Sequence, residues 1–242
     1  MSLKTDLWRA VIQAIEAAIP EYDMVNQRIT LGRALRLRNY AAEQLRLGPG
    51  MTVLDAGIGP GTMCEVLLSK SASLSAVGLD ASATLLHAAR ERLSLSFSDR
   101  VHLVRGTFEA LPFRDKCFQR IVSAYAFRDS RNRSTAIDEF SRVSADGGTL
   151  AIVDLGKPDN FFKRILVTVY VRYLMPFIAQ RSKSDSINGN PWRMIVPTYE
   201  ELRNNHDLVR SLRNRFVDVK IREFGLGGLI TIFARKSDTE PL

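Results

Sequence analysis

A glycine-rich turn around residue 57 is the feature that most constrains how this chain can fold. The apolar run at residues 51–55 ends in Asp55 and passes at once into Gly57-x-Gly59-x-Gly61, after which an amphipathic segment begins. Glycines between a strand and a helix let the backbone approach a ligand where any Cβ would collide with it. The sequence therefore predicts a β-strand, a ligand-binding turn and an α-helix in direct succession.

A second acid helps to identify the ligand. Asp80 ends the apolar run at residues 74–80, about 25 residues after Asp55, where an acid is placed to bind a ribose diol. A dinucleotide would bring a pyrophosphate, which favours bare N–H groups at the helix start with no carboxylate beside them. S-adenosylmethionine has no phosphate and carries an ammonium and a sulfonium. The two acids thus predict S-adenosylmethionine rather than NAD, the alternative being a tight turn that binds nothing.

After this turn, strand and helix patterns alternate as in a mostly parallel sheet that is covered on both faces. The expected strands lie at residues 51–55, 74–80, 101–105, 118–124 and 149–155, and the expected helices at 61–69, 82–96 and 134–143. Two last strands, 216–224 and 229–234, should form an antiparallel hairpin turned at 225–228. The predicted fold class is α/β: a Rossmann-like, seven-stranded, mostly parallel sheet with a C-terminal antiparallel hairpin and N-terminal helices.

The segments outside the sheet are expected to be mainly helical. The pattern of residues 5–47 predicts helices broken at Pro20 and near Gly32, and residues 181–191 predict a polar loop. Thr198 followed by Glu201 resembles a helix capping box. We expect one domain, 1–242, made of N-terminal helices (1–47), a cofactor-binding core (48–155), a helical cap over the cleft (156–200) and terminal strands (201–242).

Composition limits the compartment and the metal chemistry. The chain is 45% hydrophobic and 25% charged, as is typical of soluble globular proteins. No stretch reaches the roughly 18 uncharged apolar residues that a membrane span needs. Cys64 and Cys117 are too few and too far apart for a disulfide framework, which fits a reduced compartment. We therefore expect a cytoplasmic protein. The three histidines stand apart in the sequence, so we expect no metal site.

Positive charge is concentrated in the C-terminal third of the chain. The net charge is +8, and residues 159–222 hold twelve Lys/Arg against six Asp/Glu. Such a region indicates an acidic partner, either nucleic acid or an anionic membrane surface, or else only a solvated basic face.

The segment at residues 161–179 predicts an amphipathic helix. At 100° per residue, its aromatic face collects Phe162, Leu166, Val169, Tyr170, Tyr173 and Phe177. Arg164, Thr168 and Arg172 lie along the opposite face, and a central arginine argues against a spanning helix. The segment is interpreted as an interfacial helix, as one wall of a channel for a prenyl tail, or as a helix simply packed on the core.

Several further motifs carry a resemblance to a known family. They are Tyr-Asp-Met-Val-Asn at 22–26, Glu-Ala-Leu-Pro-Phe at 109–113, Phe-Arg-Asp at 127–129, Arg-Val at 142–143 followed by Gly-Gly at 147–148, and Lys-Pro at 157–158. With the acidic glycine turn, they make the chain resemble the class I methyltransferases, and more narrowly the UbiE-type C-methyltransferases of ubiquinone and menaquinone synthesis. The likeness is good over residues 22–158 and only in outline over 159–236.

The resemblance extends the set of cofactor residues beyond the turn. It implies that Ala81 follows the ribose-binding acid, that Thr107 and Phe108 lie at the adenine, and that Ser123 and Ala124 lie near the methionine end. The chain also departs from the pattern of the family. Thr107 stands for Asp or Asn, Ala124 for Ser, Asp154 for Glu, Gly156 for Ser and Pro60 for Thr.

The resemblance also suggests catalytic residues. Ring C-methylation needs an electron-rich carbon, made by removing a proton from a hydroquinone hydroxyl, and UbiE-type enzymes are thought to use a water oriented by an arginine. That role would fall on Arg128, which stays protonated but can stabilise a developing phenolate. Asp129 would be the proton acceptor or only an ion-pair partner of Arg128. Alternatively, Arg128 and Asp129 form a helix-capping pair on the surface. Tyr22 is interpreted either as a residue that closes over the cofactor or as an ordinary packing tyrosine.

The leading prediction is an S-adenosylmethionine-dependent C-methyltransferase acting on a prenylated quinol precursor at the inner face of a membrane. One alternative is an RNA methyltransferase, although Ala-Tyr-Ala-Phe-Arg at 124–128 lacks the motifs of base-methylating enzymes and no RNA-binding appendage is recognisable. We therefore do not expect nucleic acid as the acceptor. Another is a cofactor-binding protein without turnover. The oligomeric state stays open, a homodimer included.

Overall fold

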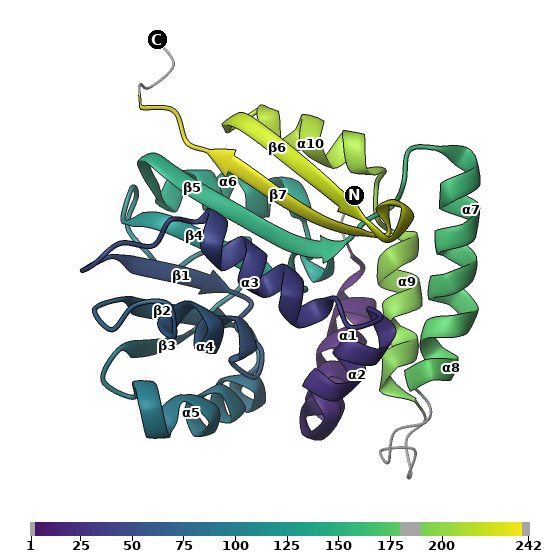
Figure 1. Cartoon of the computed structure of the whole chain (residues 1–242), viewed down its shortest axis with the longest axis horizontal. Helices are drawn as coiled ribbons and strands as arrows, with labels where there is room; N and C mark the ends of the chain where they lie inside the picture. The colour runs from purple at the N-terminus through teal and green to yellow at the C-terminus, as the bar shows by residue number, and fades with distance from the viewer. Residues whose placement is uncertain (1–2, 180–189, 239–242) are drawn as a thin grey trace.

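The strands form one seven-stranded sheet in the order β3-β2-β1-β4-β5-β7-β6 (Figure 1). The computed structural model describes residues 3–179 and 190–238. The strands are β1 Thr52–Ala56, β2 Ser75–Asp80, β3 Val101–Arg105, β4 Phe118–Ala124, β5 Ser144–Leu155, β6 Val217–Phe224 and β7 Leu229–Arg235. Strands β1 to β5 pair in parallel, and β7 runs antiparallel between β5 and β6. The predicted fold class is confirmed.

Helices cover both faces of this sheet, as the two hydrophobic cores show. Val53 and Val122 belong to the core under α3, α4 and α5, whereas Leu54 and Ile121 belong to the core under α6 and α10. Neighbouring strand residues thus point to opposite faces, and both faces are buried, as in other parallel sheets. The helices are α1 Thr5–Ala18, α2 Tyr22–Ile29, α3 Ala34–Gln44, α4 Thr62–Leu68, α5 Ala83–Phe97, α6 Arg133–Val143, α7 Phe161–Val169, α8 Met175–Ala179, α9 Ile195–Glu200 and α10 Asn205–Arg213.

Most of the predicted breaks are found at the expected residues. A short 3₁₀ turn, η1 Ile19–Glu21, interrupts the N-terminal helices at Pro20, and Gly32 takes a φ of +78° between α2 and α3. The hairpin turns through η5 Gly225–Gly227. Strand β5 differs, because it begins at Ser144 rather than at residue 149. Its first residues still pair with β4 across a shift in register, so the glycines at 147–148 lie within the strand.

The expected capping box at Thr198 and Glu201 is wrong. Thr198 lies inside α9, where its hydroxyl donates to the carbonyl of Ile195, and Glu201 follows the last residue of the helix. The helical segment begins earlier, at η4 Pro191–Met194, and the side chain of Asn190 caps it. Of the polar loop expected at 181–191, residues 181–189 lie outside the described residues.

The segment at 161–179 is helical throughout, with a π-helical stretch, η3 Tyr170–Leu174, between α7 and α8. Its buried stripe is Val167, Val171, Met175 and Ala179. The aromatic face points to solvent instead, so packing of that face on the core is wrong. Phe162 is 75% exposed and Tyr173 is 63% exposed.

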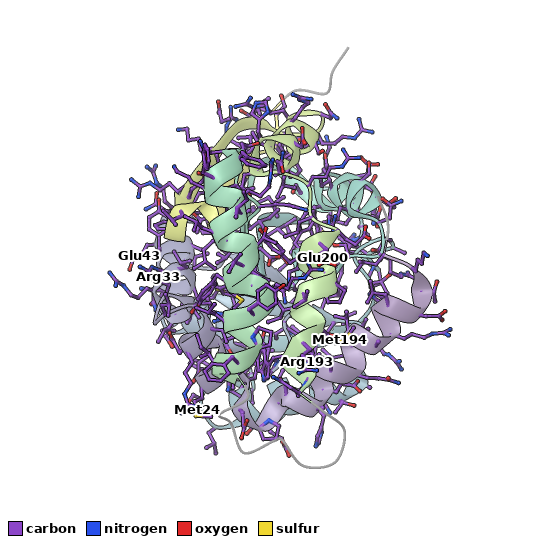
Figure 2. All side chains as sticks on the ribbon, turned by 90° about the vertical axis from the view of Figure 1, so that its right-hand side faces the viewer. Met24, Arg33, Glu43, Arg193, Met194 and Glu200 are labelled. Atoms are coloured by element: carbon purple, nitrogen blue, oxygen red, sulfur yellow. The ribbon has the colours of Figure 1, made fainter. Side chains whose placement is uncertain are left out.

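Tyr170 is the exception on this face. It is partly buried, and its hydroxyl donates to the carbonyl of Ile29. Figure 2 looks directly onto α7 and α8, with α9 beside them. Within the described residues, none of the helices has the length and hydropathy to cross a bilayer.

Candidate active site

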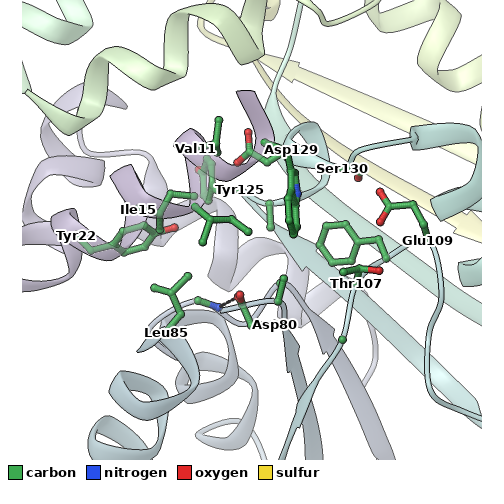
Figure 3. Close-up of a pocket in the computed structure, with 18 residues that line it drawn as sticks. Val11, Ile15, Tyr22, Asp80, Leu85, Thr107, Glu109, Tyr125, Asp129 and Ser130 are labelled. Carbon is green, nitrogen blue, oxygen red and sulfur yellow. Dashed lines mark hydrogen bonds between the residues drawn. The ribbon is translucent and has the colours of Figure 1, made fainter. Parts of the chain in front are cut away.

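A cleft opens to solvent where the carboxyl ends of β1, β2 and β4 meet. In an open α/β sheet, this edge is where ligands bind. Of the predicted cofactor residues, Gly57, Gly59, Asp80, Ala81, Thr107 and Phe108 line it. Figure 3 shows Asp80 on one side of this cleft and Asp129 on the other, with Tyr22 and Tyr125 beside them.

Each of the three positions in the turn needs glycine for a different physical reason. Gly57 has a φ of +77°, and a Cβ there would lie 2.4 Å from the Cβ of Ala126. Gly61, at a φ of +91°, packs closely against Ala89 of α5. A Cβ on Gly59, at +54°, would meet no atom within 4 Å. The space above Gly59 is therefore open to a ligand, whereas the other two glycines are needed to fold the turn.

Asp80 joins the glycine turn to the start of α5. Its Oδ2 accepts the N–H of Gly59 at 2.9 Å, and its Oδ1 accepts the N–H of Ser82 at 3.0 Å. Burial raises the pKa of this carboxyl, and the backbone N–H groups oppose that rise. Each oxygen still has a lone pair for a further donor, so the carboxylate can accept two hydroxyl groups of a ribose.

Asp55 lies behind the turn rather than in the cleft wall. It is fully buried, and neither carboxylate oxygen has a hydrogen-bond partner of good geometry among the described residues. Burial raises its pKa to about 7, and the positive charge of Arg38 opposes the rise. The backbone N–H of Cys64 also lowers this pKa, but the carboxylate stays short of good donors, so this group is suited to a cation that arrives with a ligand.

Ser123 and Ala124 do not reach the cleft in this structure. Both are buried within β4, and the cleft is lined instead by the next two residues, Tyr125 and Ala126. Tyr125 has a φ of +62°, which directs the chain sharply away from the strand. Residues that follow the end of the strand therefore reach the cleft, whereas the last residues of the strand itself stay in the core.

A second, smaller pocket adjoins the cleft. Tyr22, Tyr125 and Asp129 line both cavities, so they stand at the junction. The three residues expected to be catalytic, Tyr22, Arg128 and Asp129, all line this second pocket. Its remaining wall is mainly apolar and comes from Val11, Ala14, Ile15, Ala18, Pro191, Trp192, Met194 and Ile195.

Arg128 is held in a buried ionic network. Its Nη1 donates to Oδ1 of Asp154 and to the carbonyl of Tyr125, both at 2.9 Å, and its Nη2 lies 3.4 Å from Oδ2 of Asp129. Burial opposes its charge, but the two carboxylates together raise its pKa. The interpretation as a helix-capping surface pair is wrong, because the pair is buried and Asn132 caps α6.

Among the titratable groups at the junction, Asp129 has the pKa nearest to neutral pH. Its two oxygens are buried without a hydrogen-bond partner of good geometry among the described residues. Burial raises its pKa to about 6, against the lowering effect of Arg128. Burial likewise raises the pKa of Tyr22. A carboxylate of this kind can accept a proton at neutral pH, whereas the tyrosine stays protonated.

The motif at residues 22–26 has two separate tasks. Tyr22 and Asn26, one helical turn apart, both line the second pocket. Asp23 points elsewhere and pairs with Arg92 of α5, and it also accepts a hydrogen bond from the hydroxyl of Thr62. Asp23 thereby fixes α2 against α4 and α5, which positions Tyr22 at the junction.

Sequence reasoning missed three parts of the site. Trp8, Val11 and Ile15 of α1 line the cleft, although the pattern of residues 5–47 predicted only helices there. Asp154, noted as a departure from the family Glu, proves to be the ion-pair partner of Arg128. Arg38 was not singled out, because a single arginine in an amphipathic helix gives no signal of its burial.

The sheet order, the acidic glycine turn and the cleft above it define an S-adenosylmethionine-dependent methyltransferase with the class I fold. A solved S-adenosylmethionine-dependent methyltransferase from Aquifex aeolicus is similar, at a TM-score of 0.59 and 18% identity over 82% of this chain and 89% of that one. The [4+2]-cyclase SpnF has the same fold, with a TM-score of 0.59 and 18% identity over 84% of this chain and 81% of that one. At such identities the likeness shows the fold alone.

The family itself is shown by sequence. The profile of the ubiE/COQ5 methyltransferase family matches residues 3–232, and the chain belongs to that family. It is 30% identical, over 89% of each chain, to the ubiquinone/menaquinone biosynthesis C-methyltransferase UbiE of Syntrophotalea carbinolica. It is 29% identical to the demethylmenaquinone methyltransferase of Mycobacterium tuberculosis, over 93% of this chain and 92% of the relative.

Proposed function

We propose that this methyltransferase methylates a ring carbon of a prenylated quinol, the reduced form of a ubiquinone or menaquinone precursor. The observation that carries the proposal is the position of Asp129, which lies where the cofactor cleft meets a second, mainly apolar pocket. The names of the relatives, a ubiquinone/menaquinone biosynthesis C-methyltransferase and a demethylmenaquinone methyltransferase, support this class of substrate.

The apolar pocket suits an aromatic ring. Trp192 and Ile195 form part of its wall, and the ring of Tyr22 lies 6.0 Å from that of Trp192. Burial of a naphthoquinol or benzoquinol ring against these side chains would be favourable by about 25 cal/mol per Å² of apolar surface. The polar groups gather at one end, at Arg128 and Asp129, where a ring hydroxyl would lie.

The bound cofactor supplies an electrophilic methyl group on a sulfonium. Asp129 accepts the proton of a ring hydroxyl and becomes a neutral acid, while the electron pair stays on the oxygen. The positive charge of Arg128 stabilises this phenolate. The ring carbon then forms the bond to the methyl carbon as the methyl–sulfur bond breaks, with that electron pair going to sulfur. The proton lost from the methylated carbon passes to water, which restores aromaticity, and Asp129 returns its proton to the ring oxygen and is ionised again.

We also infer that the outer face of α7–α8 lies on an anionic bilayer. A helix that is apolar on both its inner and its outer face needs cover on both. On the outer face, Phe162, Ile165, Leu166, Val169 and Tyr173 are all at least 44% exposed. The segment of 19 residues is about 28 Å long at 1.5 Å per residue, which is enough for an interfacial helix.

Positive charges at the edge of this face favour an anionic surface as its occupant. Lys163 is exposed on α7 itself, and in Figure 2 Arg33 and Arg193 are labelled on opposite sides of α7–α8. Arg33 also acts on the pKa of Tyr170 through its charge, which places it beside η3. Leu31, 62% exposed, adds an apolar residue at the same turn. Each basic group near an anionic leaflet adds about 1 kcal/mol of binding.

The substrate proposal is tested by an activity panel. Purified protein is incubated with labelled S-adenosylmethionine and demethylated quinones of differing tail length, each with and without chemical reduction. tRNA and simple phenols are included as control acceptors. We expect label only in the lipid, and only for its reduced forms. Equal labelling of oxidised and reduced forms, or labelling of RNA alone, would overturn the proposal.

A further inference from the structure

A polar pocket lies between α6 and α10, the two helices that pack on the same face of the sheet (Figure 1). It shares no residue with the cofactor cleft or with the second pocket. Its charged lining consists of Arg133, Arg203, Arg215 and Asp138, so three arginines face one aspartate. This α6–α10 pocket therefore carries a net charge of +2.

Only one of the three arginines is paired with an acid. Arg215 donates through Nε to Oδ1 of Asp138 at 2.7 Å. Arg133 and Arg203 make no ion pair with a carboxylate of the described residues. Burial lowers the pKa of Arg133, and the like charge of Arg203 lowers it as well. A bound anion would relieve both the burial of this charge and the repulsion between the two guanidiniums.

Arg133 connects this pocket to the 3₁₀ turn η2 Phe127–Asp129. It is the first residue of α6, and its Nη2 donates to the carbonyl of Arg128 at 3.1 Å. Its Nη1 donates to the carbonyl of Glu201, after α9, at 2.8 Å. Each Nη atom carries a second N–H, so the guanidinium keeps donors for a further acceptor. An anion in the pocket would thus share the guanidinium that holds the backbone of Arg128.

The charge of Arg133 also acts on Asp129. The groups that face this carboxyl are Arg128 of η2, Asp154 of β5, Thr198 of α9 and Arg133 of α6. Burial, the largest cause, and Asp154 raise the pKa of Asp129. The other three groups lower it. A negative charge beside Arg133 would offset its positive charge and so raise the pKa of Asp129 further.

We propose that the α6–α10 pocket binds a dianion of the phosphate class, and that this anion regulates the methyl-transfer site through Arg133. Two negative charges match the net charge of the lining, and arginine can bind phosphate oxygens through two N–H groups. The rest of the lining adds neutral donors and an apolar wall, namely Ser134, Ser211, Asn214, Ile137, Leu202 and Leu208. The apolar wall favours a phosphate ester of a small organic molecule over free phosphate. Binding is independent of the methyl acceptor, whereas the regulation rests on the proposed role of Asp129.

Titration calorimetry with three anions tests the binding site. Phenyl phosphate, inorganic phosphate and sulfate are compared at about pH 7.5, where a phosphate ester carries close to two charges. The proteins are the unaltered chain, Arg203→Gln and Arg213→Gln. The last is a control of equal charge, because Arg213 is exposed on α10 and does not line the pocket. Arg203→Gln should weaken binding by about 10- to 100-fold, and Arg213→Gln should leave it nearly unchanged.

The order of affinities identifies the source of the phosphate group. Tighter binding of phenyl phosphate than of inorganic phosphate would support an organic ester, and equal binding would support the free anion. If the unaltered protein binds none of the three anions, the proposal is overturned. Equal weakening in Arg203→Gln and Arg213→Gln would overturn it too, because the anions would then respond only to the net charge of the chain.

The pH profile of methyl transfer tests the regulation separately. Sulfate stays doubly charged over this range, and sodium chloride of equal ionic strength is the control. Sulfate should move the inflection of kcat/KM, expected at about pH 6, to higher pH in the unaltered chain and in Arg213→Gln, but not in Arg203→Gln. Sulfate that binds without moving the inflection would overturn the regulation. A profile with no inflection would instead contradict the role of Asp129, and calorimetry alone would then decide the anion site.

Discussion

Arg128 and Asp154 are joined at two points: the carboxylate accepts both Nη1 of the guanidinium and the backbone N–H of Arg128, each at 2.9 Å. Asp154 comes from β5 and Arg128 from the 3₁₀ turn η2 Phe127–Asp129 after β4. Two neighbouring strands are thereby linked beside the second pocket, which Arg128 lines. The pair fixes both the direction of Arg128 and the path of the chain that carries Asp129.

Breaking this pair should destabilise the protein. Asp154→Ala leaves the buried guanidinium facing Asp129 alone, and we expect the free energy of unfolding to fall by about 3–5 kcal/mol. Asp154→Glu, which introduces the residue usual in the family, should retain most of the stability and activity. Urea unfolding with both variants measures this. A change below about 0.5 kcal/mol for Asp154→Ala would contradict the network as described.

The pH dependence of the reaction should report Asp129. Its carboxyl must be ionised to accept a proton, and its pKa is raised to about 6 by burial. With S-adenosylmethionine saturating, we therefore expect kcat/KM for the quinol to fall as pH drops through about 6, and to be constant above it until the fold or substrate titrates. Asp129→Asn should lower kcat by roughly 10²- to 10⁴-fold and remove this inflection. An unchanged profile in Asp129→Asn would assign the inflection to another group.

Asp55 should lower the stability of the ligand-free protein at neutral and alkaline pH. Its pKa is raised from 3.8 to about 7 in the folded state, so the unfolded chain ionises first. Stability from this group is present below pH 4 and is lost as pH rises from about 4 to 7. Asp55→Asn should therefore raise the free energy of unfolding at pH 8 by about 2–4 kcal/mol, and by little at pH 4.

The same variant should bind adenosylhomocysteine more weakly, because the ligand ammonium loses its counter-charge. Thermal or urea unfolding at the two pH values, together with titration calorimetry, measures both effects. An equal change in stability at pH 4 and pH 8 would show that the charge of Asp55 is not the cause.

The glycines of the turn should separate folding from binding. Gly57→Ala places a Cβ 2.4 Å from that of Ala126, so we expect loss of both stability and cofactor binding. Gly59→Ala meets no protein atom within 4 Å and adds mainly backbone strain, about 1–2 kcal/mol. Its methyl group would nevertheless occupy the space where the ligand approaches. Comparable binding in Gly59→Ala and the unaltered protein would place the ligand elsewhere.

The outer face of α7–α8 should be needed for binding to anionic vesicles. Leu166→Asp puts a charge on this face, where Leu166 is 58% exposed, and should abolish co-sedimentation with phosphatidylglycerol vesicles. Leu95→Asp is the matched control, because Leu95 is 96% exposed on α5, away from this face. Binding should weaken with salt. A dimer in solution that Leu166→Asp dissociates, without vesicle binding by either form, would identify a second copy as the occupant.

The features that sequence predicted best are local ones. The turn at Gly57 and the acid at Asp80 are defined by their own neighbours in sequence, and the structure places both at the cleft. Periodicity gave the helix at 161–179 but did not identify its buried stripe, Val167, Val171, Met175 and Ala179. A helix that is apolar on two sides has one exposed side, and spacing alone does not identify it. The capping pattern at Thr198 failed because Asn190 starts the helical segment earlier.

The residues that sequence did not predict depend on contacts between distant elements. Arg38 becomes notable only because α3 brings it beside Tyr125 and Asp55, which belong to other parts of the chain. The approach of α1 to the cleft is of the same kind, since Glu16 accepts a hydrogen bond from Ser82 at the start of α5. Contacts of this type follow from packing of the whole fold, which local propensity does not determine.

The proposed reaction places the methyl group on a quinol ring carbon at the junction marked by Asp129. Its most direct test is carbon-13 NMR of the product formed from ¹³C-methyl-labelled S-adenosylmethionine and a reduced, demethylated prenyl naphthoquinol. We predict a labelled methyl resonance on a ring carbon, present with the unaltered protein and lost with Asp129→Asn. A labelled O-methyl ether, or an equally strong ring-methyl signal from Asp129→Asn, would contradict the account.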